Sequence, residues 1–219
     1  SMAGTARLSI VRMMLERAFG DDVPGDYVEA GIWRGGTGIF ARAVQRANFQ
    51  GAMRRVIMCD SFRGLPTAST RLDDDAWSRY TYLQVSLNHV RDHFERFQML
   101  DSNVVFVRGF FMTSLPALRR KLQAEGGQIA VLFGDADMFE GYFDILYNLY
   151  EFVPVGGYFF CDDCTKSLEG WPVIWQAINR FRDENNITEP IMTIEESGLG
   201  AYWRKVRDVA VNYTKYLER

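Results

Sequence analysis

The chain has 219 residues, 47% of them hydrophobic, and a formal net charge of -3. This length suits one α/β domain spanning 1–219 and is short for two domains. The charge balance gives no general reason to expect binding to nucleic acid or to an anionic membrane. No apolar run reaches the roughly 18 residues of a transmembrane helix, and no signal peptide is visible. We therefore expect a cytoplasmic protein that acts on a small molecule.

The chain contains three cysteines, Cys59, Cys161 and Cys164. An odd, low count favours a reducing compartment over a disulfide scaffold. Cys161-x-x-Cys164 matches a redox spacing, but Cys161 lies inside an apolar run, and no second CxxC or histidine pair follows it. The pattern favours small buried packing residues over redox or zinc chemistry.

Hydrophobic periodicity predicts alternating helices and strands along the chain. An N-terminal helical region occupies 1–22, with its periodic stretch at 5–19. Further helices are expected with the apolar stripes Phe40, Ala43, Val44 and Ala47; Val90, Phe94 and Phe97; Ile145, Leu146 and Leu149; and Trp171, Ile174, Trp175, Ile178 and Phe181. Strands are expected at 26–33, 54–60, 103–110, 128–135 and 157–162. Residues 190–206 are typical of a hairpin with its turn at Ser197-Gly198.

Near-continuous apolar strands that alternate with helices predict a parallel sheet covered on both faces. The terminal hairpin adds antiparallel strands at one side, which gives a seven-stranded, mostly parallel α/β sheet of Rossmann-like type. Ligands of such sheets bind beyond the carboxyl ends of the strands.

A glycine-rich turn follows the first predicted strand, with the spacing Glu29-x-Gly31-x-x-x-Gly35-Gly36. This is not the GxGxxG of a standard NAD site. It fits the looser turn of Rossmann-like methyltransferases that bind S-adenosylmethionine (SAM). Asp60 ends the second strand, where an acid can accept hydrogen bonds from both ribose hydroxyls of a nucleoside. The plainer alternatives are a strand-to-helix turn and an Asp60 carboxylate that caps the following turn.

Paired aspartates end two apolar strands. If the first, fourth and fifth strands are neighbours, Asp135, Asp162 and Asp163 converge in one crevice, and a divalent cation that prefers oxygen ligands, Mg²⁺, Mn²⁺ or Ca²⁺, would relieve their repulsion. Within a strand, Asp162 and Asp163 would point to opposite faces, so both reach one ion only if the strand has already given way to a loop. Asp137 and Glu140 are expected at a helix start instead. Helix capping and solvated strand ends are the alternative for the whole set.

Five segments together resemble the TylF family of macrocin-type O-methyltransferases: "VPGDYVEAGIWRGGTGIFARAV", "CDSFRGLP", "DADMFEG", "PVGGYFFCDD" and "AYWRK". The likeness runs from about Val23 to Arg204. It implies a metal-dependent class I SAM methyltransferase that methylates sugar hydroxyls on antibiotics. The family pattern is close to DGD-x-Y-E-S where this chain has "DADMFEG", so Ala136, Phe139 and Gly141 are departures.

The resemblance also implies roles for individual residues. It places the metal ligands at Asp135, Asp162 and Asp163, and the SAM-binding residues at Glu29, Gly31, Arg34, Gly35, Asp60, Ser61, Gly109 and Asp135. The region 67–100 would form a substrate-facing cover. The family's histidine base would fall near 77–79, where this chain has none, and His89 and His93 are interpreted as ordinary helix-face residues.

The sequence thus predicts a SAM-dependent, Mg²⁺-dependent O-methyltransferase acting on a vicinal diol of a sugar or glycosylated natural product. A different acceptor, a catechol or an amine, stays open. So does a SAM-binding protein with weak or no catalysis, which the missing histidine supports. A nucleotide-dependent oxidoreductase is disfavoured by the glycine spacing. Nothing in the sequence decides between a monomer and a homo-oligomer.

Overall fold

A computed structural model describes residues 3–165, 172–194 and 199–218. Seven strands form one sheet in the order β3-β2-β1-β4-β5-β7-β6. The strands are β1 Asp26–Ala30, β2 Val56–Asp60, β3 Val104–Arg108, β4 Ile129–Gly134, β5 Tyr158–Thr165, β6 Met192–Thr193 and β7 Leu199–Arg204. The first five are mutually parallel, and β7 runs antiparallel to both β5 and β6. The predicted fold is therefore confirmed, while the turn at Ser197-Gly198 and the side chain of Trp171 lie outside the described residues.

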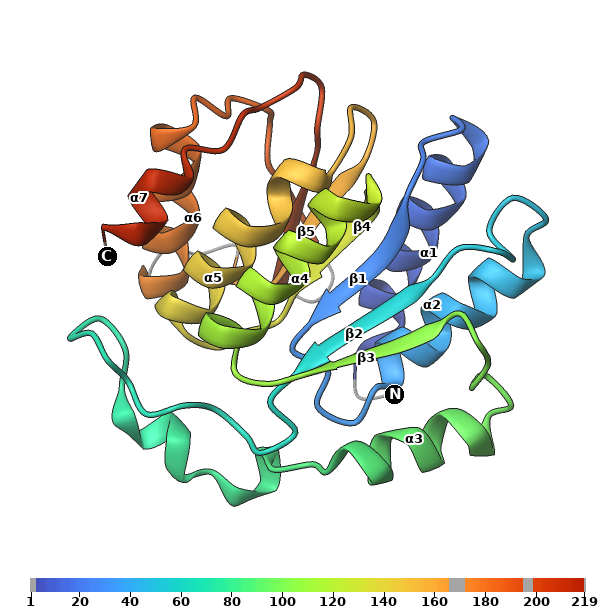
Figure 1. Cartoon of the computed structure of the whole chain (residues 1–219), viewed down its shortest axis with the longest axis horizontal. Helices are drawn as coiled ribbons and strands as arrows, with labels where there is room; N and C mark the ends of the chain where they lie inside the picture. Colours follow the sequence, from blue (N-terminus) through green and yellow to red (C-terminus); the bar gives the residue numbers. More distant parts are fainter. Residues whose placement is uncertain (1–2, 166–171, 195–198, 219) are drawn as a thin grey trace.

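Helices cover both faces of this sheet (Figure 1). They are α1 Gly4–Gly20, α2 Gly36–Ala47, α3 Leu87–Arg96, α4 Phe111–Glu125, α5 Phe139–Leu149, α6 Pro172–Glu184 and α7 Tyr213–Leu217. One apolar cluster joins the sheet to α4–α7, and a second joins the opposite face to α1–α3. Because both faces are covered, every residue of β1 and β4 is buried, as the continuous apolar runs predicted.

Two helices, α4 and α7, were not predicted from the sequence. The helix α4 buries Leu115, Leu118 and Leu122 against the sheet, a spacing that forms one helical face. Pro116 lies inside this helix, and an internal proline argues against a helix in sequence reasoning. The five-residue α7 buries Tyr216, which is too short a segment to show periodicity.

The apolar stripe predicted for α2 is partly wrong. Phe40 and Val44 are half-buried, whereas the polar Arg42 and Gln45 are fully buried. The Arg42 guanidinium pairs with Asp101 at 2.8 Å and donates to the carbonyls of Ala52 and Arg54, and Gln45 donates to Arg55 O. Buried polar groups are tolerated when they are hydrogen-bonded, and here the loop before β2 supplies the acceptors.

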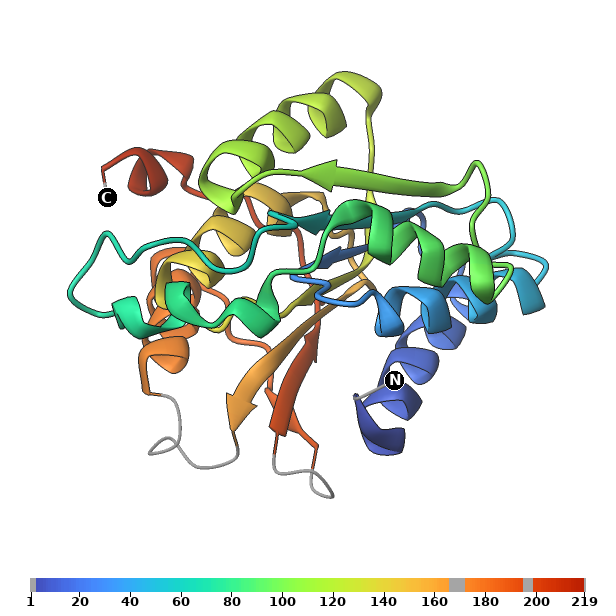
Figure 2. The same cartoon turned by 90° about the horizontal axis from the view of Figure 1, so that it is seen from below.

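The carboxyl ends of the parallel strands meet at one edge of the sheet. The segment 61–86 crosses this edge as an extended loop with two short turns of 3-10 helix, Asp75–Arg79 and Thr81–Leu83, before it enters α3 (Figure 2). We call 61–86 the cover segment. None of the described helices is both long and apolar enough to cross a lipid bilayer.

Candidate active site

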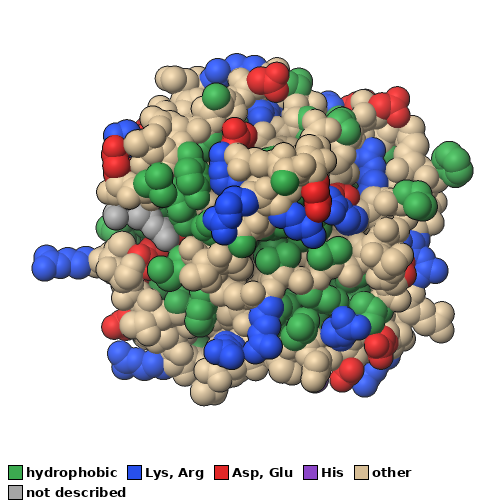
Figure 3. All heavy atoms as spheres, in the orientation of Figure 1, with side chains coloured by type: hydrophobic (Ala, Val, Ile, Leu, Met, Phe, Trp, Pro, Cys, Tyr) green, Lys and Arg blue, Asp and Glu red, His purple; other side chains and the backbone are tan. Residues whose placement is uncertain are grey.

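A pocket of about 300 Å³ lies between the strand ends and the cover segment. Its polar wall follows β1, β2, β4 and β5 and includes Gly31, Asp60, Ser61, Asp135, Asp137, Asp162 and Asp163. Its apolar wall includes Trp33, Leu65, Pro66, Leu83, Phe110, Phe111, Met112 and Met138. Figure 3 shows hydrophobic side chains gathered across the middle of the molecule in the orientation of Figure 1, with Lys and Arg side chains on either side. The pocket therefore combines an acidic end with an apolar wall.

Gly31 brings the ends of β1 and β4 into direct contact. Its φ is +91°, and a Cβ at this position would lie 1.5 Å from the carbonyl oxygen of Asp135. No other residue fits, because the added atom would overlap backbone that is itself held by the Asp135 N–H donating to Ala30 O. The glycine turn thus places Asp135 against the end of β1.

Four other residues that the resemblance assigns to SAM binding stand back from the pocket wall. Gly35 has a φ of +76° and packs against Val90 and Phe94 of α3. Arg34 is exposed and lies over the Trp33 ring, 4.3 Å from its centroid. Glu29 and Gly109 are likewise absent from the lining. These residues shape the turns behind the pocket, and a direct contact with SAM stays a prediction.

Glu29 lies beneath the glycine turn, fully buried. Its carboxyl accepts a hydrogen bond from the Tyr27 hydroxyl at 2.9 Å. Burial raises its pKa to about 8, and the negative charges of Asp162 and Asp60 add to that increase. The Glu29 carboxyl therefore keeps its proton to a higher pH than a free glutamate does.

Asp60 joins two turns with its carboxylate. Oδ2 accepts from the backbone N–H groups of Ile32 at 3.0 Å and Trp33 at 3.3 Å, and Oδ1 accepts from Phe62 N–H at 2.7 Å. Burial raises its pKa, and these backbone hydrogen bonds oppose the increase. The turn-capping alternative is therefore realised, and because Asp60 also lines the pocket, its predicted contact with ribose stays a prediction.

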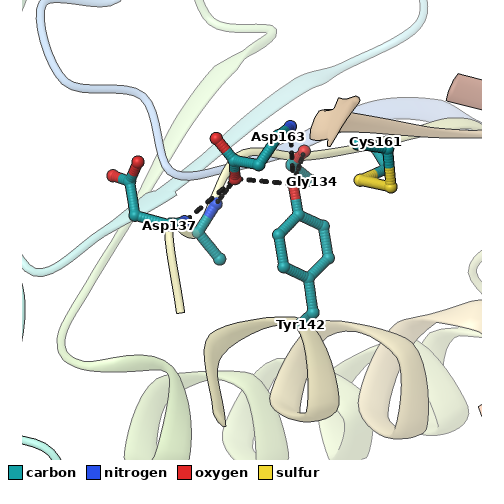
Figure 4. The surroundings of a disulfide bond; sticks show 7 residues. Gly134, Asp137, Tyr142, Cys161 and Asp163 are labelled. Atoms are coloured by element: carbon teal, nitrogen blue, oxygen red, sulfur yellow. Dashed lines mark hydrogen bonds between the residues drawn. A yellow bond between two sulfur atoms is a disulfide. The ribbon is translucent and has the colours of Figure 1, made fainter. Parts of the chain in front are cut away.

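Three carboxylates converge at the acidic end of the pocket. One oxygen from each of Asp135, Asp137 and Asp163 lies within 4.8 Å of the others. Asp163 Oδ2 accepts from the backbone N–H groups of Ala136 at 3.2 Å and Asp137 at 2.9 Å. It also lies 2.8 Å from the Tyr142 hydroxyl, as Figure 4 shows. Of the three aspartates expected to converge, Asp135 and Asp163 belong to this cluster, and its third member is Asp137 rather than Asp162.

Asp162 is directed toward the N-terminal helix. Its Oδ1 lies 2.8 Å from Arg7 Nε, an ion pair in which both side chains are largely buried. Asp135 is also close to it: burial raises the pKa of Asp135, and the negative charge of Asp162 adds to that increase. Asp162 therefore contacts the edge of the cluster and shares its charge with α1, which the sequence did not suggest.

The geometry at the end of β5 explains how the consecutive residues Asp162 and Asp163 both lie near the loop after β4. The strand continues to Thr165, so the loop that we expected there is not found. Its pairing with β7 is irregular, however: Cys161 faces Ala201 and Thr165 faces Leu199, so three residues oppose one. Such a bulge re-aims side chains next to active sites. The bulge thereby replaces the expected loop.

Cys161 and Cys164 form a disulfide across this bulge, with their Cα atoms 5.6 Å apart. Both are fully buried, as predicted, but they are paired with each other rather than being separate packing residues. The only free cysteine of the described chain is Cys59, which is buried at the end of β2. The cysteine count gave no indication of this pair because a short-range bridge needs local geometry that a count does not contain.

Burial dominates the electrostatics of the cluster. It raises the pKa values of Asp137 and Asp162 to about 7 each, and it also raises those of Asp135 and Asp163. Repulsion between the carboxylates adds to the increase, whereas the Arg7 guanidinium opposes it for Asp135, Asp162 and Asp163. Buried carboxylates with so little counter-charge favour a bound cation. Their oxygen-only donor set suits Mg²⁺, Mn²⁺ or Ca²⁺.

The predicted start of the helix after β4 is only partly correct. Glu140 lies in the first turn of α5, as expected, but Asp137 does not cap it; Asp137 has a φ of +57° and faces the carboxylate cluster. The cap comes from Asp73 in the cover segment, whose oxygens accept from the N–H groups of Phe139 at 2.6 Å and Glu140 at 3.0 Å. A carboxylate at a helix N-terminus is favourable for both hydrogen bonding and the helix dipole.

Further contacts fasten the cover segment to the sheet. The Glu140 carboxylate accepts from the backbone N–H of Ser69 at 3.1 Å and from the Ser69 hydroxyl. On the opposite side, the Trp33 indole N–H donates to Tyr82 O at 3.0 Å. Of the cover predicted at 67–100, Thr67, Ser69 and Leu83 line the pocket, whereas no residue of α3 does, and a contact of the cover with substrate stays a prediction.

The two histidines are surface residues of α3. His93 Nδ1 lies 3.0 Å from the carbonyl oxygen of Arg34, and the His89 ring stacks edge-on against it. Both lie on α3, and neither lines the pocket, so their interpretation as ordinary helix-face residues stays a prediction. Residues 77–79, where the family histidine would fall, belong to the first short 3-10 turn and do not line it either.

Two of the departures from the family pattern are complementary. A Cβ on Gly141 would lie 2.6 Å from the Cβ of Ala136. The pattern that the chain resembles places glycine and serine at these two positions, and here the methyl group of Ala136 fills the space that a side chain at 141 would use.

The structure adds three residues to the site that the sequence reasoning missed: Arg7, Asp73 and Tyr142. Tyr142 is fully buried, accepts from Asp163 N–H at 3.3 Å and lies 2.9 Å from Gly134 O. Tyr142 follows Asp135 and Asp137 closely in the sequence, in the helix after β4, and this short spacing could have suggested it. Arg7 reaches the cluster through Asp162, and Asp73 reaches the start of α5; both come from distant segments, and no local pattern indicates them.

The fold matches that of solved methyltransferases. The structure of the O-methyltransferase NovP aligns with a TM-score of 0.84 and 34% identity, over 94% of this chain and 82% of that one. The calicheamicin methyltransferase CalS11 shares the fold with a TM-score of 0.70 and 19% identity, over 90% of this chain and 77% of that one. The fold and the pocket at the strand ends define a class I SAM-dependent methyltransferase.

Sequence comparison then gives the family. Residues 1–205 match the family described as Macrocin-O-methyltransferase (TylF). A tetracenomycin 4'-O-methyltransferase of Streptomyces olivaceus is 36% identical over 93% of this chain and 75% of its own length. Demethyldecarbamoylnovobiocin O-methyltransferase of Streptomyces niveus is 34% identical over 94% and 76%, respectively. The chain belongs to the TylF family and is a SAM-dependent O-methyltransferase.

Proposed function

We propose that this enzyme methylates a sugar hydroxyl of a glycosylated natural product, with a divalent cation held at the carboxylate cluster. The observation that carries the proposal is the acidic end of the pocket, beside the glycine turn and opposite an apolar wall. The relatives support the acceptor class: one is named for a rhamnosyl tetracenomycin and another for mycinamicin III. The apolar wall suits the non-sugar part of such a molecule.

The SAM site is proposed at the ends of β1 and β2. Gly31, Asp60 and Ser61 line the pocket there, next to Asp135. Glu29, Arg34, Gly35 and Gly109 would support this site by shaping the turns behind it. Gly31 lets the backbone approach the cofactor closely, and Asp60 holds the two turns together while facing the pocket.

The cation site is proposed around Asp135 and Asp163, which belong both to the set that the sequence predicted and to the geometric cluster. Asp162 is the third ligand by family resemblance, and Asp137 is the third carboxylate by geometry. When bound, a divalent ion supplies Lewis-acid chemistry that lowers the pKa of a coordinated hydroxyl. The buried carboxylates fit this role because the described chain offers the cluster little positive charge besides Arg7.

The remaining residues position the acceptor and exclude water. Correct alignment of the two reactants can lower the barrier by about 7–11 kcal/mol. Here the cover segment provides that alignment from above through Leu65 and Leu83, and the start of α4 provides it from the side through Phe111 and Met112. No described histidine lines the pocket, so a carboxylate of the cluster or water would take the proton of the acceptor hydroxyl.

Two assays test the proposal. Calorimetric titration with S-adenosylhomocysteine and SAM measures cofactor binding, and transfer of labelled methyl from SAM measures turnover on an aryl rhamnoside, a free catechol and an aryl amine. We expect binding of both nucleosides and transfer to the rhamnoside. Binding without transfer to any acceptor would favour the SAM-binding protein of weak activity, and transfer to the catechol or the amine alone would overturn the sugar assignment.

A further inference from the structure

The Cys161–Cys164 disulfide lies at the one place in β5 where the strand departs from regular pairing. Three residues, Asp162 to Cys164, oppose the single residue Gly200 of β7, and the bridge joins the residue before this bulge to its last residue. Asp162 and Asp163 are the two residues enclosed by the bridge. A bulge inserts extra backbone that pairing does not hold, so its conformation needs another constraint.

The two enclosed carboxylates make unlike contacts in different directions. Asp163 receives two backbone N–H groups from the loop after β4 and the Tyr142 hydroxyl from α5. Asp162 pairs with Arg7 of α1 and lies near enough to Asp135 for its charge to add to the effect of burial on the pKa of Asp135. In a regular strand these neighbouring side chains would point to opposite faces of the sheet. The bulge lets both reach the segment Asp135–Asp137, and the disulfide fixes the bulge.

We propose that the Cys161–Cys164 disulfide is a positioning clamp for the active site: it holds Asp162 and Asp163 in the arrangement that binds the cation. This inference rests in part on the proposed cation site. The clamp is structural, because both sulfur atoms are buried in the apolar core between the sheet and α4–α6, away from solvent. The cysteine spacing that resembled a redox motif thereby acquires a role in the site.

The first test is the oxidation state of the purified enzyme. The protein is denatured without reductant, alkylated and analysed by mass spectrometry. We expect one alkylated cysteine, Cys59, and three after prior reduction. Three alkylated cysteines without reduction would overturn the proposal.

The second test separates positioning from general stability. The variant Cys161→Ala/Cys164→Ala is compared with Cys59→Ala, a matched control at a buried free cysteine. Changing a residue that orients metal ligands costs about 10–100-fold in metal affinity. We expect Mn²⁺ binding, measured by calorimetry, to weaken by about this factor in the double variant alone, with unchanged affinity for S-adenosylhomocysteine. Mn²⁺ binding equal to that of the unsubstituted enzyme would contradict the clamp.

The third test does not depend on the cation. If the clamp places Asp162 against Arg7, the effect of Arg7→Gln on the urea midpoint should shrink in the double cysteine variant, because the two sites are coupled. Strict additivity of the two effects on the urea midpoint would contradict the placement of Asp162 against Arg7.

Should the double variant fail to fold, Cys164→Ala alone breaks the bridge and is measured in the same way. If the unsubstituted enzyme binds no Mn²⁺, the cation site fails as a proposal, while the alkylation and Arg7 experiments still decide the clamp.

Discussion

The acidic end of the pocket and the cover segment lie beside each other but are held by different means. Backbone pairing, buried N–H donors and a disulfide position the aspartates that follow β4 and β5. The cover segment is largely exposed and is fastened by side-chain contacts at Ser69, Asp73 and Tyr82. Groups that need fixed geometry are best carried by rigid elements, whereas loops tolerate change. The comparison suggests that the chemistry belongs to the strand ends and acceptor selection to the cover.

The largest effect is expected from the strand ends. Asp135→Asn or Asp163→Asn should lower turnover by about 10³-fold, since a metal ion contributes several kcal/mol to such a reaction. Methyl transfer is measured at saturating SAM. The matched control Asp92→Asn removes an exposed carboxylate of α3 and should change little. If either variant kept a tenth of the activity, the chemistry could not be assigned to the aspartates at the strand ends.

The next effect concerns pH and the buried Glu29. Its pKa rises from 4.5 to about 8 on folding, so the folded chain holds a proton that the unfolded chain releases above about pH 4.5. This contribution to stability is fully present below pH 4.5 and is lost as the pH rises through about 8. In Glu29→Gln the free energy of unfolding should fall less as the pH rises, by on the order of a few kcal/mol over this range.

Urea unfolding from pH 5 to pH 9 in chelator measures the Glu29 effect. Glu125→Gln is the control, because this carboxylate is partly exposed and pairs with Arg55. A parallel pH dependence in Glu29→Gln and the unsubstituted chain would show that another group is responsible.

The third effect tests the coupled departures at the β4–α5 loop. Gly141→Ser should destabilise the fold by about 1–3 kcal/mol, because the new Cβ meets that of Ala136. The double variant Ala136→Gly/Gly141→Ser restores the family's residues and should recover most of that loss. Thermal unfolding of the single and double variants gives the coupling. Additive losses would show that the two positions are independent.

The smallest effect is expected in the cover. Asp73→Ala removes the cap of α5 and should cost about 1 kcal/mol. Because it also releases the cover, limited proteolysis within 61–86 should accelerate and the KM for the acceptor should rise more than kcat falls. Asp74→Ala, which loses a cap only within the cover, is the matched control. Equal rates of proteolysis within 61–86 in the two variants would show that Asp73 does not hold the cover segment in place.

The sequence predicted the sheet and the crevice at the carboxyl ends of its strands, because apolar runs are local patterns. The meeting of β1, β4 and β5, which brings Asp135 and Asp163 together, entered only as a condition, because strand order depends on tertiary packing. It missed the bulge at Asp162-Asp163 and the bridge that closes it, since both depend on the register with β7. It also missed Arg7 and Asp73, which reach the site through tertiary packing alone. The sequence placed Asp137 at the start of a helix, because an aspartate just before a helix is a common cap. A local pattern does not reveal that Asp73, from a distant segment, caps this helix instead.

The metal dependence of turnover tests the central claim most directly. The enzyme is stripped with EDTA, dialysed, and assayed for methyl transfer from SAM to an aryl rhamnoside before and after addition of Mg²⁺ or Mn²⁺. The account predicts turnover near background in the stripped enzyme and full recovery with the ion, with no recovery in Asp163→Asn. Unchanged turnover in the stripped enzyme would contradict the role assigned to the carboxylate cluster.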